Sequence, residues 1–173
     1  MTKTPTRILL VDDHRLVRDG LRLIIEKQPD LRVIGEAADG PTALERAAAS
    51  PPDLVVMDIH LPGQNGIEIS RKMLASFPRV KIVILSASPD PSYAEEALQI
   101  GVAGYILKEN ASEELIRGIR MVLGGMIYLC PEMMTLLIRH RQAIPALITV
   151  TQPLLSESER RVLILVAELC RTA

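Results

Sequence analysis

Polar side chains that could share one reaction site stand at the ends of short aliphatic runs. Asp12 and Asp13 follow one run, and Asp58, Ser86 and Lys108 each stand directly after another. Three carboxylates brought together repel one another by roughly 4 kcal/mol per pair at about 4 Å in a surface-like dielectric, so the cluster requires cations. Mg²⁺ suits this set better than zinc, because it prefers oxygen ligands and needs only one or two carboxylates plus a phosphate oxygen. Lys108 supplies a second positive charge.

Asp58 is the side chain placed to act as a nucleophile. The turn Ile59–Gly63 follows it directly, so the backbone must leave the strand sharply and expose the carboxylate. Aspartyl phosphates are a known form of covalent catalysis, and phosphoryl transfer mainly requires in-line positioning and charge neutralisation. The hydroxyl of Ser86 and the backbone amide of Ala87 would donate hydrogen bonds to two further phosphoryl oxygens.

A parallel sheet must bring these positions together, because they lie far apart in the sequence. Up to about Leu123 the chain alternates short aliphatic runs with longer amphipathic stretches, a pattern typical of an α/β fold. The expected strands are Ile8–Val11, Arg32–Gly35, Leu54–Met57, Lys81–Leu85 and Gly104–Leu107. Right-handed crossovers place such strands in one doubly wound sheet with helices on both faces, and ligands bind at the carboxyl ends of the strands. Arg32–Gly35 has only two aliphatic residues and is expected at an edge.

Helices are expected to connect and follow these strands. They cover residues around Leu16–Ile25 and Ala43–Ala48, where apolar residues recur at helical spacing, and then Gly66–Ser76, Pro91–Ile100 and Ser112–Leu123. Pro41 is a suitable first residue for the second helix. Ser112 is expected to cap the last one, with Glu113 and Glu114 in its positive first turn.

The pattern changes after residue 125 and indicates three parts. They are a first domain over residues 1–125, a helical linker over 126–155 and the first helix of an incomplete second domain over 156–173. A helix is expected at Pro131–Arg141, and Pro145 and Pro153 indicate a linker after it. Ser156 and Glu159 form a capping-box pattern, which predicts that another helix begins there.

Four stretches resemble the receiver domains of bacterial response regulators. They are Ile8–His14 (ILLVDDH), Val55–Gly63 (VVMDIHLPG), Ser86–Ala87 and Gly104–Lys108 (GYILK). The resemblance covers about Thr6–Leu123 and implies a flavodoxin-like sheet of five strands in the order 2-1-3-4-5. It also implies a phosphorelay signalling protein and not an enzyme, apart from slow self-catalysed phosphorylation and dephosphorylation. Asp58 would take its phosphoryl group from a sensor histidine kinase or a small phosphodonor, with Mg²⁺ or Mn²⁺ as cofactor.

The resemblance assigns metal ligands to individual residues. Asp13 and Asp58 would bind the metal directly. The backbone carbonyl of His60 would be a third protein ligand. Asp12 would act mostly through a bound water.

The resemblance also implies a switch. Lys108 would pair with the phosphoryl group while Ser86 moves toward it. Tyr105 matches an aromatic position that turns inward once Ser86 has moved, and the surface made by Tyr93–Leu123 would change as a result. A homodimer through Pro91–Leu123 is a further expectation.

The C-terminal residues resemble the opening helix of a LuxR-type DNA-binding domain. Leu155–Arg160 (LSESER) with Val162 and Leu163 carries this similarity. Many receivers have a proline where Glu109 stands, and the absence of that proline is common in the same NarL/FixJ subgroup. The similarity then ends, because Leu169 stands where that subgroup usually has glycine and the helices that would enter the major groove are missing. The resemblance therefore implies transcription control by a full-length form, and no operator binding by these residues alone.

Composition argues against several other classes. The 173 residues carry a net charge of −1 with no Trp, one Phe and three Tyr, so basic and aromatic surfaces for single-stranded nucleic acid are lacking. Cys130 and Cys170 have no zinc-ligand spacing and suggest no disulfide framework. No signal peptide is readable after Met1–Arg7 and no apolar stretch is long enough to span a bilayer, so a cytoplasmic protein without a membrane partner is expected.

Two other functional interpretations remain open. A degenerate receiver would act only as a constitutive protein-interaction module, although the occupied motif positions argue against it. An aspartyl-phosphate phosphatase typically has Asp-x-Asp after its first strand, whereas Asp12, Asp13 and His14 stand together here. A metal site built on His14 and His60 is not indicated, because their spacing does not place them on one face of a helix.

Overall fold

The computed structural model describes residues 4–143, with side chains described as far as His140. The strands are β1 (Thr6–Val11), β2 (Leu31–Ala37), β3 (Leu54–Asp58), β6 (Lys81–Ser86), β7 (Gly104–Leu107) and β8 (Tyr128–Leu129), together with the short hairpin of β4 (His60–Leu61) and β5 (Gln64–Asn65). The helices are α1 (Arg15–Glu26), α2 (Gly40–Ala49), α3 (Gly66–Ser76), α4 (Pro91–Gln99), α5 (Ala111–Leu123) and α6 (Pro131–Ala143), with a 3₁₀ turn, η1, at Lys108–Asn110. None of the described helices has the length and apolar composition needed to cross a bilayer.

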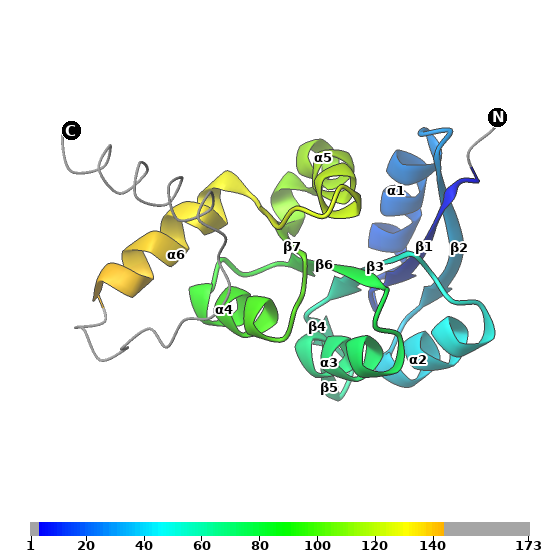
Figure 1. Cartoon of the computed structure of the whole chain (residues 1–173), viewed down its shortest axis with the longest axis horizontal. Helices are drawn as coiled ribbons and strands as arrows, with labels where there is room; N and C mark the ends of the chain where they lie inside the picture. The colour runs from blue at the N-terminus through cyan, green and yellow to red at the C-terminus, as the bar shows by residue number, and fades with distance from the viewer. Residues whose placement is uncertain (1–3, 144–173) are drawn as a thin grey trace. The chain divides into compact units, whose positions relative to one another are not determined.

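The main sheet is parallel throughout and has helices on both faces. Its strands lie in the order β2-β1-β3-β6-β7-β8. Figure 1 shows α1 and α5 on one face and α2, α3 and α4 on the other. Ile8 and Leu10 of β1 point into the core beneath α1 and α5, whereas Leu9 and Val11 point into the core beneath α2, α3 and α4. Strands buried on both faces read as continuous aliphatic runs, which is why the sequence identified them.

The strands and helices expected within residues 4–143 form, and the doubly wound α/β fold is confirmed. The run expected at an edge, Arg32–Gly35, belongs to β2, which is the edge strand next to β1. The predicted cap at Ser112 is wrong, because the chain passes from β7 through η1 and α5 already begins at Ala111. Asn110 is the residue before that helix and makes no side-chain cap.

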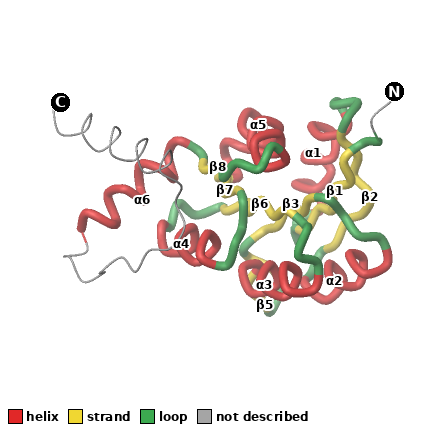
Figure 2. The backbone as a smooth tube through the Cα atoms, in the orientation of Figure 1, coloured by secondary structure: helices red, strands yellow, loops and turns green. Residues whose placement is uncertain are grey.

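A sixth strand, β8, extends the sheet beyond the five that the sequence predicted (Figure 2). It pairs with Gly104 and Tyr105 of β7. The amide of Tyr128 donates to the carbonyl oxygen of Ala103 at 2.9 Å, and the amide of Cys130 donates to that of Tyr105 at 3.1 Å. A strand of two residues leaves no aliphatic run in the sequence, so only its partner strand reveals it.

Residues 126–142, expected to be a linker, belong to the same compact unit as the sheet. That unit extends to Gln142. Cys130, Met133 and Leu137 are buried in the same core as Ala94 of α4. The boundary expected at residue 125 therefore lies inside the unit. The rest of the expected linker, 144–155, and the helix expected from residue 156 lie outside the described residues.

Candidate functional site

Three strands bring charged side chains together at the carboxyl edge of the sheet. Asp12 follows β1, Asp58 ends β3 and Lys108 follows β7. The Nζ atom of Lys108 lies 2.7 Å from Oδ2 of Asp12 and 2.7 Å from Oδ2 of Asp58. Asp12 and Asp58 are each only 1% exposed. Because β6 lies between β3 and β7, Lys108 must reach past the end of β6 to make both contacts.

The electrostatics of this site favour an additional cation. Burial raises the pKa of Asp58, the carboxylate of Asp12 raises it further, and Lys108 only partly opposes them. Burial alone would lower the pKa of Lys108, but its hydrogen bonds to Asp12 and Asp58 outweigh this effect and the pKa is raised. Lys108 is therefore an ammonium group near neutral pH, while ionised Asp58 remains costly. One ammonium group does not neutralise two carboxylates.

Asp13 adds a third carboxylate, and we call Asp12, Asp13 and Asp58 the acidic cluster. Together with His14, each of these residues offers one potential ligand atom, and the four atoms lie within 4.8 Å of one another. Nδ1 of His14 lies 2.7 Å from Oδ1 of Asp13 and 3.3 Å from Oδ1 of Asp12. Carboxylate oxygens are the ligands that Mg²⁺ prefers, so the acidic cluster fits such an ion.

His14 joins this group although its spacing in the sequence gave no indication of it. His14 and His60 are not spaced to share one helical face, and His14 lies in the loop between β1 and α1. That loop is tightened by a hydrogen bond from the amide of His14 to Oδ1 of Asp12, at 2.8 Å. Proximity of His14 to the carboxylates therefore follows from a local turn.

The turn after β3 holds Asp58 through its backbone. The amide of His60 donates to Oδ1 of Asp58 at 3.2 Å, and the amide of Gly66 donates to the carbonyl oxygen of Ile59 at 2.7 Å. A Cβ atom at Gly66 would overlap the carbonyl oxygen of Asp58, so the first residue of α3 must be glycine here. The backbone carbonyl of His60 as a metal ligand stays a prediction.

Ser86 and Tyr105 are both fully buried, and Ser86 hydrogen-bonds within its own loop. The hydroxyl of Ser86 donates to the carbonyl oxygen of Ser88 at 2.8 Å and accepts from the amide of Ser88 at 3.1 Å, so it is turned toward its own loop. Ala87 follows it and is exposed. Tyr105 is fully buried, its hydroxyl has no hydrogen-bond partner, and burial raises its pKa to about 12. Tyr105 lies inward while Ser86 bonds to Ser88, and a switch that couples the two residues stays a prediction.

Arg18 of α1, outside the sequence motifs, contacts the acidic cluster and is itself paired with Glu36 of β2. Nη1 of Arg18 donates to the backbone carbonyl oxygen of Asp12 at 2.6 Å, and Nε of Arg18 donates to Glu36 at 3.0 Å. Glu36 also accepts from Nε of Arg22 at 2.7 Å. Burial on its own would raise the pKa of Glu36, but the hydrogen bonds from Arg22 and Arg18 lower it overall. The sequence shows these residues only as polar positions of a helix and a strand.

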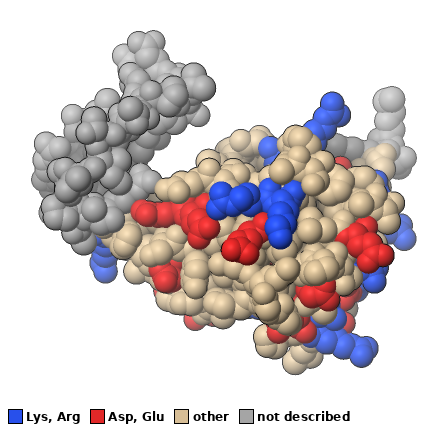
Figure 3. Space-filling model, turned by 90° about the horizontal axis from the view of Figure 1, so that it is seen from below, with Lys and Arg blue, Asp and Glu red and all other residues tan. Residues whose placement is uncertain are grey.

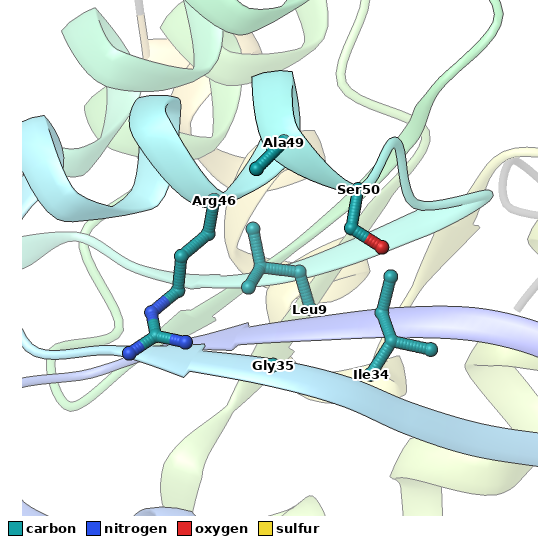
Figure 4. Close-up of a pocket in the computed structure, with 6 residues that line it drawn as sticks. All are labelled: Leu9, Ile34, Gly35, Arg46, Ala49 and Ser50. Carbon is teal, nitrogen blue, oxygen red and sulfur yellow. The ribbon is translucent and has the colours of Figure 1, made fainter.

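A second feature of the fold, a pocket of about 110 Å³, lies between α2 and the β1–β2 pair (Figure 4). It is lined by Leu9, Ile34, Gly35, Arg46, Ala49 and Ser50. The register of β1 and β2 shifts between Ile8 and Leu9, next to this pocket. On the face seen in Figure 3, acidic and basic side chains of the described residues lie next to one another. Because neither feature combines buried carboxylates with an ammonium group, the acidic cluster is the candidate site.

Known proteins similar to this chain are bacterial regulators. A family model described as the response regulator receiver domain matches residues 8–120. The chain is 35% identical over 134 residues to the transcriptional regulatory protein DegU of Brevibacillus brevis, which covers 78% of this chain and 57% of that protein. It is 38% identical over 135 residues to the oxygen regulatory protein NreC of Staphylococcus carnosus (strain TM300), covering 78% and 62%. The chain thus spans less than two thirds of the length of these relatives.

A solved structure shares the fold at comparable identity. The crystal structure of a two-component response regulator of the LuxR family from Aurantimonas sp. SI85-9A1 matches with a TM-score of 0.77 and 34% identity, covering 80% of this chain and 99% of that one. The residues matched by the family model include the acidic cluster and Lys108. The chain therefore belongs to the receiver domains of two-component response regulators, and its relatives are regulators of the NarL/LuxR type.

Proposed function

We propose that this receiver domain is a phosphoacceptor switch, in which Asp58 takes a phosphoryl group from a sensor histidine kinase or a small phosphodonor in a Mg²⁺-dependent step. The observation that carries the proposal is the single ammonium group of Lys108, held 2.7 Å from both buried carboxylates. This arrangement leaves negative charge that a divalent cation would offset, and it presents an aspartate at the end of a strand, where α/β sheets bind ligands.

The proposed reaction is a transfer between two nucleophiles. An oxygen of the Asp58 carboxylate forms a bond to phosphorus as the bond from phosphorus to the donor breaks, and the donor imidazole or acetate keeps the electron pair. Mg²⁺, when bound, neutralises charge on the transferred phosphoryl oxygens. Lys108 pairs with one of these oxygens, and Ser86 must leave Ser88 to donate to another, with the amide of Ala87 beside it.

Metal binding in this proposal uses the acidic cluster. Asp13 and Asp58 bind the ion directly, the backbone carbonyl of His60 is a third protein ligand, and Asp12 acts mainly through a water molecule. The compact oxygen-rich arrangement of the cluster supports this assignment. The neighbouring ammonium of Lys108 limits how many more positive groups the site can hold.

The proposed output is the surface formed by α4, β7 and α5. Tyr105 lies in β7 and is buried in the same core as Ala94 of α4, so a change around Ser86 and Tyr105 would alter α4. A homodimer through this surface is the proposed assembly. Contact with DNA is proposed only for a form that carries DNA-binding helices, since the relative named as a transcriptional regulatory protein is longer than this chain.

Labelling with acetyl phosphate and Mg²⁺ tests the chemistry. Intact-mass measurement should show a single added phosphoryl group that is labile to base, and EDTA should prevent it. Asp58→Asn should abolish the labelling, whereas Asp53→Asn, which changes an exposed carboxylate just before the other end of β3, should label like the wild type. Labelling that persists in Asp58→Asn overturns the proposal.

The comparisons do not support either of the other interpretations. A phosphatase would turn over phosphomonoesters steadily, whereas the proposed switch takes up phosphate once and releases it slowly. A constitutive interaction module would show the same surface with and without beryllofluoride and Mg²⁺. Amide NMR spectra of residues 91–123 under both conditions separate that module from the switch.

A further inference from the structure

We propose that Arg18 is a positioning residue for the acidic cluster and that Glu36 holds Arg18 in place. This inference rests on the Mg²⁺ site proposed above. Arg18 contacts the backbone of the cluster and not its carboxylate groups. It donates to the carbonyl oxygen of Asp12 at 2.6 Å. Its side chain is only 14% exposed, so the contact is held inside the protein.

Every polar group of Asp12 is held by a different part of the fold. Its amide donates to the carbonyl oxygen of Ala37 at the end of β2, at 3.1 Å. Its Oδ1 accepts from the amide of His14 at 2.8 Å, and its Oδ2 lies 2.7 Å from Lys108. Arg18 holds the remaining group, the carbonyl oxygen. Without Arg18, the carbonyl of Asp12 would be held only through the turn that the amide of His14 closes.

The contact with Arg18 also determines where Asp13 points. The carbonyl of Asp12 and the amide of Asp13 belong to one planar peptide group, so fixing the carbonyl fixes the start of the next residue. Asp13 is 31% exposed in its side chain and is paired with His14. No helix or strand includes Asp13, so the position of its carboxylate depends on the peptide plane held by Arg18 and on the contact with His14.

Glu36 orients the guanidinium group. Its Oε2 accepts from Nε of Arg18 at 3.0 Å, while its Oε1 accepts from Arg22 on the next turn of α1. Glu36 lies in β2 opposite Leu10, so it is anchored in the sheet beside β1. A guanidinium group is a rigid fork, so a carboxylate on Nε leaves Nη1 aimed at the carbonyl oxygen of Asp12. A lysine has no such fork and cannot make both contacts with the same geometry.

The arrangement predicts an effect on metal affinity and not on the maximum extent of phosphorylation. The positive charge of Arg18 is paired with Glu36 and is not directed at a carboxylate of the cluster. Its removal leaves the three carboxylates and Lys108 in place but lets the loop between β1 and α1 move. Residues that orient metal ligands typically change metal affinity by about 10- to 100-fold when they are replaced.

The experiment compares Arg18→Met with Arg22→Met in the complete chain. Both substitutions remove an arginine that binds Glu36 from α1, but only Arg18 reaches Asp12. Mg²⁺ alone is titrated and followed by amide NMR shifts. We expect Arg18→Met to weaken Mg²⁺ binding about 10-fold or more, Arg18→Lys to fall between it and the wild type, and Arg22→Met to stay within about twofold of the wild type. Acetyl phosphate labelling of Arg18→Met should need correspondingly more Mg²⁺ and reach the wild-type plateau.

Each outcome decides the proposal. Unchanged Mg²⁺ affinity in Arg18→Met overturns it, and so does an equal loss in Arg22→Met, which would assign the network to the packing of α1 alone. If Arg18→Met does not fold, Arg18→Lys and Glu36→Gln provide the same comparison. A wild-type protein that binds Mg²⁺ but is not labelled contradicts the phosphoacceptor function and leaves the Arg18 proposal standing, whereas a wild type that does not bind Mg²⁺ overturns both.

Discussion

The ammonium group of Lys108 lies 2.7 Å from the carboxylate of Asp58, although 50 positions separate the two residues in the chain. Only the parallel sheet brings them together, because Asp58 ends β3 and Lys108 follows β7. The same ammonium group also contacts Asp12, so one cation serves two buried carboxylates. The charge balance of this buried site therefore depends on the same three groups.

Lys108→Met should lower the free energy of unfolding at neutral pH. Methionine keeps the apolar stem but leaves Asp12 and Asp58 without their cation. We expect a loss of roughly 1–3 kcal/mol, less than for a fully buried pair because Lys108 keeps partial access to water. Urea unfolding in Mg²⁺-free buffer measures it. Lys81→Met, at the exposed start of β6, should change the value by less than about 0.5 kcal/mol. Equal losses in the two variants would contradict the explanation.

Asp58→Asn should become more stable than the wild type as pH rises. The pKa of Asp58 is raised above its ordinary value of 3.8, first by burial and then by Asp12. The folded protein therefore holds a proton that the unfolded chain has lost, so this carboxyl group costs stability as pH rises through the raised pKa. Asparagine does not ionise. The advantage of the variant in urea unfolding without Mg²⁺ should grow as pH rises above about 4, where the unfolded chain loses its proton first. An advantage that is constant with pH would refute this reasoning.

Mg²⁺ should reverse that order at neutral pH. At the metal site proposed above, the ion would bind the folded wild type, and a ligand that binds only the folded state raises the free energy of unfolding. Asp58→Asn lacks one of the proposed ligands and should gain less from the same Mg²⁺ concentration. Unfolding curves with and without the ion provide the comparison.

Gly66→Ala should damage both the fold and the site. The added Cβ atom would overlap the carbonyl oxygen of Asp58, and backbone cannot move aside as a flexible side chain does. We expect a loss of about 1–3 kcal/mol in unfolding free energy together with reduced labelling by acetyl phosphate. Gly20→Ala is the control, because a Cβ atom there meets nothing within 4 Å. Gly20 lies inside α1, so alanine should stabilise that variant by about 0.5–1 kcal/mol.

Tyr105→Phe should leave the unfolding free energy within about 1 kcal/mol of the wild type or raise it slightly. The hydroxyl is buried without a hydrogen-bond partner, so its removal relieves an unsatisfied group. Tyr105→Ala should instead cost about 3–5 kcal/mol, because it empties a space in the core. In a spectrophotometric titration, the phenol that ionises at about pH 12 should be missing from Tyr105→Phe. A large loss in Tyr105→Phe would indicate a hydrogen bond made by the hydroxyl.

The fold followed from the sequence wherever burial left a long pattern. β1, β3, β6 and β7 lie between layers of helices, so each appears as an aliphatic run that needs no partner to be recognised. β8 has two residues, and it is a strand only because Gly104 and Tyr105 lie beside it. The start of α5 was misplaced for a related reason, since the 3₁₀ turn at Lys108–Asn110 takes up the residues before Ser112.

Only part of the candidate site, likewise, could be predicted from the sequence. Asp12, Asp58 and Lys108 could be placed from sequence because strand ends converge by topology. The direction of the Ser86 hydroxyl could not, because it depends on which neighbour a freely rotating group meets, and here that is Ser88. The contact between Arg18 and Asp12 was also beyond the sequence, because it depends on how closely α1 packs beside β1.

β8 also limits where the chain can be truncated without exposing β7. A fragment ending at residue 125 would lack β8, so the backbone groups of Gly104 and Tyr105 would be unpaired at the edge of the sheet. A neighbouring molecule can add a strand to such an edge. The fragment would also lack Cys130 and Met133, and so expose the hydrophobic core that these residues share with Tyr105. Self-association measured on such a fragment would be an artefact of the truncation, whereas a fragment that keeps α6 retains the native edge strand.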